Sequence, residues 1–252
     1  MRILVGFFGL LAQILTPIFT QHPTGGGGGT FAKVAEGVAG SSNSGVSVSI
    51  TLNTTGATAI LIAVSNYLPN TAFNVLSDAV GACSSPCNTW TQIGTQNGGS
   101  GSITTVTYYG CLSGCTVGSG HTFTYTTTSG SSYPTIGVLA VSGGAATKDQ
   151  TNSAGTAGTL TSIQTGSVTP SVNNELLFTA FSVDQFFGGT PSIDSSFTFT
   201  GTSGIDYIEQ TGGQCFPLAI AYQIQTTATA RNPTWTWTSS ATGAAAIIGT
   251  FE

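Results

Sequence analysis

Apolar and polar residues alternate along much of the chain with the period of a β-strand. Val46, Val48, Ile50 and Leu52 alternate with serine and threonine, which indicates a strand with one buried face. The run Ile60–Val64 is continuously apolar, as in a strand that is covered on both faces. Similar segments predict further strands near residues 73–80, 90–94, 103–110, 122–128, 136–141, 163–168, 176–183, 197–200, 218–224, 234–238 and 245–251.

No helical period of useful length interrupts these segments, so we expect an all-β fold. Many short strands separated by glycine-rich and asparagine-rich turns are typical of a large antiparallel β-sandwich of the jelly-roll kind. The second half repeats the order of apolar patterns of the first. Segments 59–65, 105–109, 122–126 and 136–141 correspond to 175–182, 219–222, 234–238 and 246–251. We interpret this as two pseudo-similar halves of one sandwich; two independent domains are the alternative.

The N-terminus differs from the remainder of the chain. Ile3–Phe19 is almost wholly apolar and follows the basic start Met1-Arg2, which predicts a signal peptide over residues 1–22. A retained membrane anchor is the alternative, because the run is only slightly shorter than a ~20-residue span. Gly25–Gly29 make residues 23–29 a flexible linker. Residues 30–252 are expected to form a single sandwich domain.

Composition restricts the partners that this domain can have. Charged residues make up 5% of the chain and hydrophobic residues 40%, the reverse of the disordered signature. The net charge is −5 with four basic residues, and binding to phosphate needs clustered lysine and arginine. Nucleic acid is therefore excluded as a partner.

Four short strings carry a resemblance to a known kind of domain. They are Asn88-Thr89-Trp90-Thr91, Ser167–Ser171, Asn173–Leu177 and Ala221–Thr226. With these strings the chain, from about residue 30 to its end, resembles a recurrent jelly-roll-like β-sandwich domain of bacterial secreted and phage-associated proteins. The resemblance implies a jelly-roll-like fold and an extracellular setting, and it transfers no catalytic residues.

Two cysteine pairs with the same spacing, Cys83/Cys87 and Cys111/Cys115, lie in predicted turns. The strand order between them returns the chain to the same end of the sandwich, so both pairs should lie at one edge. A four-thiolate zinc site is one reading, but an exported protein meets an oxidising environment that favours disulfides. We predict two disulfides with connectivity left open, and a free thiol at Cys215.

Aromatic side chains are the next candidates for binding. Trp235 and Trp237 share one strand face and offer a platform for sugar rings; filling of the core is the alternative, because the threonines between them occupy the polar face. Phe186 and Phe187 stand in a glycine-flanked loop, where we expect an exposed contact.

Acidic and nucleophilic residues give weaker signals. Asp184, Asp194 and Asp206 could supply a calcium site with loop carbonyls, the one cofactor the sequence suggests. A glycosidase needs two facing carboxylates, for which Asp206 and Glu209 are the candidates. His121 precedes a strand without a recognisable nucleophile motif, so we expect a hydrogen-bonded histidine at a strand end.

These patterns favour a secreted or cell-surface protein without catalytic activity that serves binding or adhesion, with carbohydrate or another surface ligand as its partner. The second hypothesis is a structural subunit of an extracellular filament, sheath or virion, in which residues 30–40 add a strand to another copy. A glycoside hydrolase is the third.

Overall fold

The computed structural model describes residues 30–41, 45–67, 75–83, 85–99, 104–127, 132–143, 146–193, 205–208 and 216–252. The described residues form strands and connecting turns. No helix among them has the length and apolar character needed to span a membrane. The strands are β1 (Ala32–Gly40), β2 (Ser47–Leu52), β3 (Ala59–Tyr67), β4 (Val75–Ala79), β5 (Thr91–Gly98), β6 (Thr104–Cys111), β7 (His121–Thr126), β8 (Thr135–Ser142), β9 (Lys148–Gln164), β10 (Glu175–Val183), β11 (Ser192–Ile193), β12 (Ile205–Ile208), β13 (Leu218–Gln225) and β14 (Thr234–Phe251).

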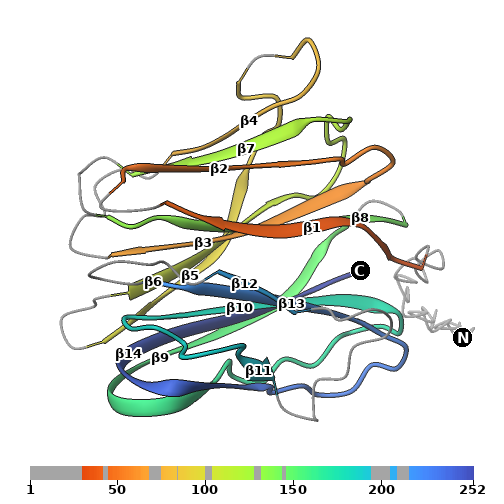
Figure 1. The fold of residues 1–252 in the computed structure, drawn as a ribbon. Coiled ribbons are helices and arrows are strands. Elements are labelled where there is room, and N and C mark those ends of the chain that lie inside the picture. Colours follow the sequence, from red (N-terminus) through yellow and green to blue (C-terminus); the bar gives the residue numbers. More distant parts are fainter. Residues whose placement is uncertain are drawn as a thin grey trace, which may run out of the picture.

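These strands make three antiparallel sheets stacked in layers (Figure 1). The first inner sheet has the order β1-β8-β3-β6-β5, and the outer sheet has the order β2-β7-β4. The second inner sheet has the order β11-β14-β10-β13-β12, with β9 also paired to β14. The predicted all-β sandwich is therefore confirmed.

Two hydrophobic cores flank the first inner sheet. Alternate side chains of β3 point to opposite faces, as the strand period requires. Leu61 and Ala63 belong to the core between the two inner sheets, together with Phe178 and Ile247 from the opposite sheet. Ile60 and its alternate neighbours pack on the other face against Phe123 and Tyr125 of the outer sheet. The continuous apolar run of β3 follows from this double burial.

A third core covers the far face of the second inner sheet, where β14 folds back over its own sheet. Its first segment pairs with the end of β9 and with β11, and register irregularities lie between Thr236 and Gly243. The rings of Trp235 and Trp237 therefore pack on the ring of Phe181 of β10. Their centroids lie 4.7 and 5.4 Å from the Phe181 centroid, respectively. We call residues 162–164, 192–193 and 234–238 the folded-over ribbon.

The strand pairings repeat between the two halves of the chain. In the first half Ala63 of β3 pairs with Tyr108 of β6 and Gly137 of β8. In the second half Ala180 of β10 pairs with Ile220 of β13 and Ile247 of β14. The start of β9 takes the place of β1, and the folded-over ribbon takes the place of the outer sheet. The sequence prediction of two pseudo-similar halves is thus confirmed at the level of topology.

All ladders between the described strands join strands of the same half. The halves meet through side chains and a few close backbone contacts. Ser65 and Ser182, at equivalent positions, share a buried hydrogen bond of 2.6 Å between their hydroxyls. A Cβ atom on Gly98 would lie 2.0 Å from the carbonyl oxygen of Ala244, so this backbone approach requires glycine.

Two sequence predictions about elements differ from the structure. Residues 234–238 and 245–251 were expected to be separate strands but form one long, bent strand, β14. β9 starts at Lys148, well before the predicted segment at 163–168, because its glycine-rich and threonine-rich start has no apolar alternation. The predicted segment 197–200 lies outside the described residues.

Candidate functional site

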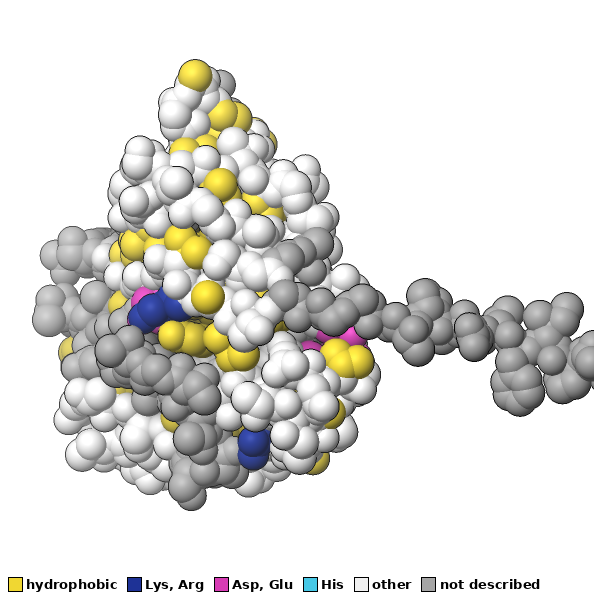
Figure 2. Space-filling model, turned by 90° about the vertical axis from the view of Figure 1, so that its right-hand side faces the viewer, with side chains coloured by type: hydrophobic (Ala, Val, Ile, Leu, Met, Phe, Trp, Pro, Cys, Tyr) yellow, Lys and Arg dark blue, Asp and Glu magenta, His cyan; other side chains and the backbone are white. Residues whose placement is uncertain are grey.

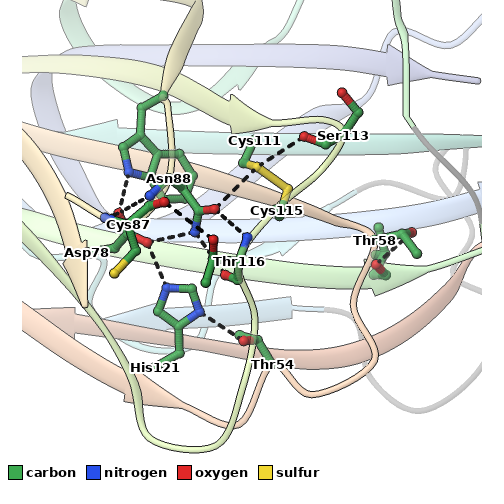
Figure 3. Close-up of a disulfide and its surroundings, with 12 residues drawn as sticks. Thr54, Thr58, Asp78, Cys87, Asn88, Cys111, Ser113, Cys115, Thr116 and His121 are labelled. Atoms are coloured by element: carbon green, nitrogen blue, oxygen red, sulfur yellow. Dashed lines mark hydrogen bonds and ion pairs between the residues drawn. A yellow bond between two sulfur atoms is a disulfide. The ribbon is translucent and has the colours of Figure 1, made fainter. Parts of the chain in front are cut away.

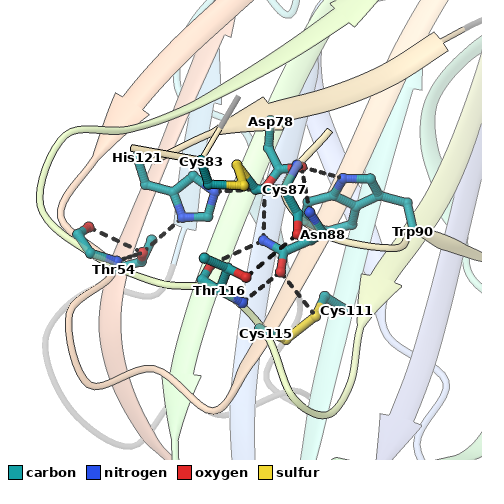
Figure 4. A network of polar contacts seen from close by, with 11 residues as sticks. Thr54, Asp78, Cys83, Cys87, Asn88, Trp90, Cys111, Cys115, Thr116 and His121 are labelled. Carbon is teal, nitrogen blue, oxygen red and sulfur yellow. Dashed lines mark hydrogen bonds and ion pairs between the residues drawn. A yellow bond between two sulfur atoms is a disulfide. The ribbon is translucent and has the colours of Figure 1, made fainter. Parts of the chain in front are cut away.

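Two disulfides lie in neighbouring loops: Figure 3 shows the Cys111–Cys115 bond with Cys87 nearby, and Figure 4 labels all four cysteines. They join Cys83 to Cys87 and Cys111 to Cys115, each within its own loop. Asn88 connects the two loops, because it follows Cys87 directly and its Oδ1 lies 3.8 Å from Cys111 Sγ. The predicted disulfides at a common edge are therefore confirmed, with the pairing that the sequence left open now assigned. Such bonds fit an oxidising environment.

Asp78, in β4, is the centre of a buried polar network beside the disulfides (Figure 4). Its Oδ1 accepts hydrogen bonds from the backbone N–H groups of Cys87 and Asn88 and from Trp90 Nε1, at 3.0–3.1 Å. Its Oδ2 accepts from Asn88 Nδ2 at 2.7 Å and lies 2.9 Å from His121 Nε2. One carboxylate therefore fastens the first cysteine loop to the start of β7.

His121 and Asn88 extend the network to the neighbouring loops. His121 Nδ1 lies 2.9 Å from the hydroxyl of Thr54, which in turn accepts a hydrogen bond from the backbone N–H of Gly118. Asn88 Oδ1 accepts from Thr116 N at 2.6 Å, and its Nδ2 donates to the Thr116 carbonyl. The expectation of a hydrogen-bonded histidine at a strand end is confirmed.

The order Thr54–His121–Asp78 resembles a hydroxyl–imidazole–carboxylate triad, but its surroundings differ from those of an active site. All three side chains are buried, and Thr54 is held from both sides by Gly118 and His121. A nucleophile must reach the substrate carbonyl, which this buried hydroxyl cannot do without opening of the edge. The arrangement is suited to bracing loops.

The electrostatics of Asp78 agree with that role. Burial raises the pKa of its carboxyl, but hydrogen bonds from His121, Asn88 and Trp90 favour the charged form and hold the pKa below the ordinary value of 3.8. Asp78 is thus a carboxylate throughout the neutral range, with all of its strong donors in place.

The outer sheet carries a ladder of hydroxyl groups on its outward face. Ser47, Ser49 and Thr51 of β2 stand opposite Thr126, Thr124 and Thr122 of β7. The three hydroxyl pairs lie 3.3, 2.8 and 2.8 Å apart. Val48, Phe123 and Tyr125 face inward, so the strand period places aromatic and hydroxyl rows on opposite faces. We call these six residues, with Ser77 of β4 beside Thr124, the hydroxyl face.

The folded-over ribbon has the same chemistry at the opposite end of the molecule (Figure 1). Its β14 segment reads Thr234-Trp235-Thr236-Trp237-Thr238, as β7 reads Thr122-Phe123-Thr124-Tyr125-Thr126. Thr236 pairs with the hydroxyl of Ser192 at 2.6 Å, and Gln164 Nε2 donates to Thr234 at 3.4 Å. The T-x-T-x-T spacing predicted a polar strand face at residues 234–238, but the pairing of its hydroxyls with those of a neighbouring strand has no signal in the sequence.

The aromatic residues singled out from the sequence do not form an exposed platform. Trp235 and Trp237 are buried at 0% and 6% exposure, so the core alternative describes them. Phe187 is also fully buried and contacts Phe181, with centroids 4.8 Å apart. The prediction of an exposed contact is therefore wrong for Phe187, because this loop folds back over the third core. Phe186 remains at the surface, with 37% exposure.

The acidic residues proposed for calcium are not brought together among the described side chains. Asp184 is buried, and its carboxylate accepts hydrogen bonds from the backbone N–H groups of Thr242 and Gly243, which fixes the bend of β14. The side chain of Asp206 and all of Asp194, Glu209 and Cys215 lie outside the described residues. Within the described part of the chain, no three histidine, cysteine, aspartate or glutamate residues gather as a metal site.

Few charged side chains are visible on the face in Figure 2, and much of its described surface is white, the colour of the backbone and of uncharged polar side chains. Comparison with family models, with curated proteins and with solved structures found no match. The resemblance to the jelly-roll-like domain of bacterial secreted and phage-associated proteins thus stays a prediction.

Proposed function

We propose that this is an exported, non-catalytic protein that binds an uncharged, hydroxyl-rich polymer surface, such as a polysaccharide, through its hydroxyl face. The observation that carries the proposal is the ladder of paired serine and threonine hydroxyls on the outer sheet. Each pair shares one hydrogen bond, so at least one further donor and several acceptor positions per pair remain for a ligand.

The geometry of a sheet gives these groups a regular spacing. Neighbouring strands lie ~4.8 Å apart and alternate residues along a strand ~6.8 Å apart. A polymer with hydroxyls at repeated intervals can therefore meet several rows at once. The face contains no charged side chain among its seven residues, which favours a neutral ligand over an ionic one. Rigid support from the aromatic row beneath lowers the ordering cost of binding.

The proposal can be tested by co-sedimentation with insoluble cellulose, chitin and xylan. We expect the wild-type protein to bind at least one of them, with little change between low and high salt because no charges take part. Replacing Thr122 and Thr124 with valine keeps the shape and strand preference but removes two hydroxyls. At about 1 kcal/mol for each lost hydrogen bond, affinity should fall at least tenfold.

The matched control is Thr95→Val, which removes an exposed hydroxyl from β5 on the first inner sheet. It should bind as the wild type does. Absence of wild-type binding to every polymer, or equal binding by the double variant and the control, would refute the proposal.

A structural subunit is the second candidate, and β1 is the observation that favours it. This strand lies at the edge of the first inner sheet, is only half-buried over most of its length and has a register irregularity between Lys33 and Ala35. It follows the glycine linker directly in sequence. If β1 of one copy paired with β8 of another copy, the contacts that it now makes within its own chain would link the two subunits.

A further inference from the structure

The strand β2 forms one edge of the outer sheet (Figure 1). Among the described strands, only β7 pairs with it. Strand edges in natural proteins usually carry a lysine, a proline, a bulge or a cover that prevents pairing with another chain. β2 reads Ser-Val-Ser-Ile-Thr-Leu, with no charge, proline or glycine, and its ladder with β7 has no register irregularity. Nothing in the residues of this strand therefore opposes the addition of a further strand.

Three other edges of the first half are protected by such devices. β1 carries the ion pair of Lys33 and Glu36 and has a register irregularity. β4 carries the inward-pointing charge of Asp78, which is held in the buried polar network. The edge of β5 is covered by β9, where Gly99 N donates to the carbonyl of Thr156 at 2.9 Å. Of these four edges, only β2 lacks a protecting feature.

The backbone of β2 directs hydrogen-bonding groups to its free side in a fixed order. The carbonyl of Val46, just before β2, accepts a hydrogen bond of 2.7 Å from the N–H group of Thr127, just after β7. Backbone groups of successive residues in an antiparallel ladder point to opposite sides of the strand. The even-numbered residues of 46–52 therefore bond to β7. The N–H and C=O groups that point to the free side belong to Ser47, Ser49 and Thr51.

This edge is complementary to itself about Ser49. If two copies of β2 pair in antiparallel fashion with Ser49 opposite Ser49, then Ser47 of each copy stands opposite Thr51 of the other. Hydroxyl meets hydroxyl in this register, as it does in the ladder between β2 and β7. The same register places Val46, which is 42% exposed, opposite the half-buried Leu52. A slip by one residue would set hydroxyls against apolar side chains and lose the backbone match.

We propose that β2 is a homodimer interface, in which the β2 edges of two copies pair in antiparallel fashion about a two-fold axis at Ser49. Such an interface is isologous and closed, so it produces a dimer and not a filament. The two three-stranded outer sheets would become one continuous sheet. Their hydroxyl faces would lie side by side on the same surface, because the axis is perpendicular to the sheet. The dimer itself does not depend on polymer binding.

The expected association is weak, because the paired edges are short. A contact of this size belongs to the small, transient class of interfaces, for which we expect a dissociation constant on the order of 0.1 mM. Chromatography at about 10 µM should then show mostly monomer, whereas sedimentation equilibrium at about 0.5 mM should find most chains in dimers.

Ser49→Lys tests the position of the axis. It sets two ammonium groups opposite each other, and an exposed lysine is a natural protection of strand edges. Dimerisation should weaken by roughly tenfold or more, because like charges directly opposite each other are destabilising. The matched control is Thr95→Lys, which adds the same charge at an exposed position of β5. This control should dimerise as the wild type does.

Chemical cross-linking tests the register, in a chain that also carries Cys215→Ser. Opposite residues of a hydrogen-bonded antiparallel pair have Cα atoms ~5.5 Å apart, so a short bis-maleimide should join two copies of Ser49→Cys. Ser47→Cys alone should not be joined, because the two copies of residue 47 would lie ~14 Å apart along the strands. Addition of Thr51→Cys to Ser47→Cys should restore the cross-linked dimer.

A wild-type protein that stays monomeric at the higher concentration would overturn the proposal, as would equal dimerisation by Ser49→Lys and the wild type. Cross-linking of Ser47→Cys as efficient as that of Ser49→Cys would also overturn it, because the register would be wrong. Polymers formed by exchange of β1 would persist in Ser49→Lys, and self-association is measured without polysaccharide. The dimer can therefore fail or hold independently of both candidate functions.

Discussion

Asp78 shows how much one residue can contribute when it is the common acceptor of several donors. Replacing it with asparagine keeps the shape but brings an N–H₂ group or a weaker acceptor against His121, Asn88 and Trp90. Removing one partner from a buried charged network typically costs 3–5 kcal/mol. We expect Asp78→Asn to lower the free energy of unfolding at pH 7 by about 3 kcal/mol in chemical denaturation.

The pH dependence of that difference identifies its origin. The folded-state pKa of Asp78 lies below the ordinary 3.8, so the stabilisation is complete above that pH and is lost as the pH falls through the folded-state value. The difference in free energy of unfolding between the wild type and Asp78→Asn should therefore become smaller below pH 4. A gap that stays constant from pH 7 to pH 3 would contradict the assignment of the effect to the Asp78 charge.

At the scale of the residue, the sequence predicted where a side chain lies in the fold better than it predicted which other side chains it contacts. The strands between the two cysteine pairs indicated that both pairs lie at one edge, because strand order alone decides which loops share an end. Asp78 could not be found in this way, because 43 residues separate it from His121 and no spacing rule joins them.

At the scale of the element, β1 allows the second candidate function to be tested. If β1 pairs between copies, the protein produced from residue 23 onward should elute as polymers in size-exclusion chromatography. Ala32 pairs with Ser142 of β8, so Ala32→Cys with Ser142→Cys can lock β1 into its own sheet. The oxidised double variant should then elute as a monomer, whereas Ala32→Cys alone should still polymerise. A wild-type protein that is monomeric at all concentrations would exclude strand exchange.

Elements with strong local periodicity, such as β3, β7 and β10, were predictable because the pattern of their apolar residues indicates directly whether one or both faces are buried. β9 was not, because its start lies on a sheet edge and carries glycine, threonine and asparagine with few apolar positions. The bend of β14 was also beyond sequence reasoning. It depends on Asp184 binding the backbone at Thr242 and Gly243, a contact between residues far apart in the chain.

At the scale of the whole molecule, the repeat of topology means that each half builds its own inner sheet and covers only one face of it. The face of the first inner sheet buries Leu61 and Leu139, and the face of the second buries Phe178 and Ile220. Separation would expose both faces to water, at ~25 cal/mol for each Å² of apolar surface. The side chains between the two inner sheets are packed as in the core of a single domain, so we expect the two halves to stay associated as long as the protein is folded.

We therefore expect the intact chain to unfold in a single calorimetric transition, although every described ladder lies within one half. Residues 30–144 and 145–252, produced separately, should each aggregate or bind a hydrophobic dye, and should form a soluble complex when refolded together.

Tyr108 provides a control within the interface, because its hydroxyl donates to the carbonyl of Ile247 across the halves at 2.8 Å. Tyr108→Phe should weaken the fragment complex without unfolding either sheet, since one hydrogen bond is worth about 1 kcal/mol. Two well-separated transitions in the intact chain, or a soluble and folded isolated half, would show that the halves are independent domains and that the shared core between them is dispensable.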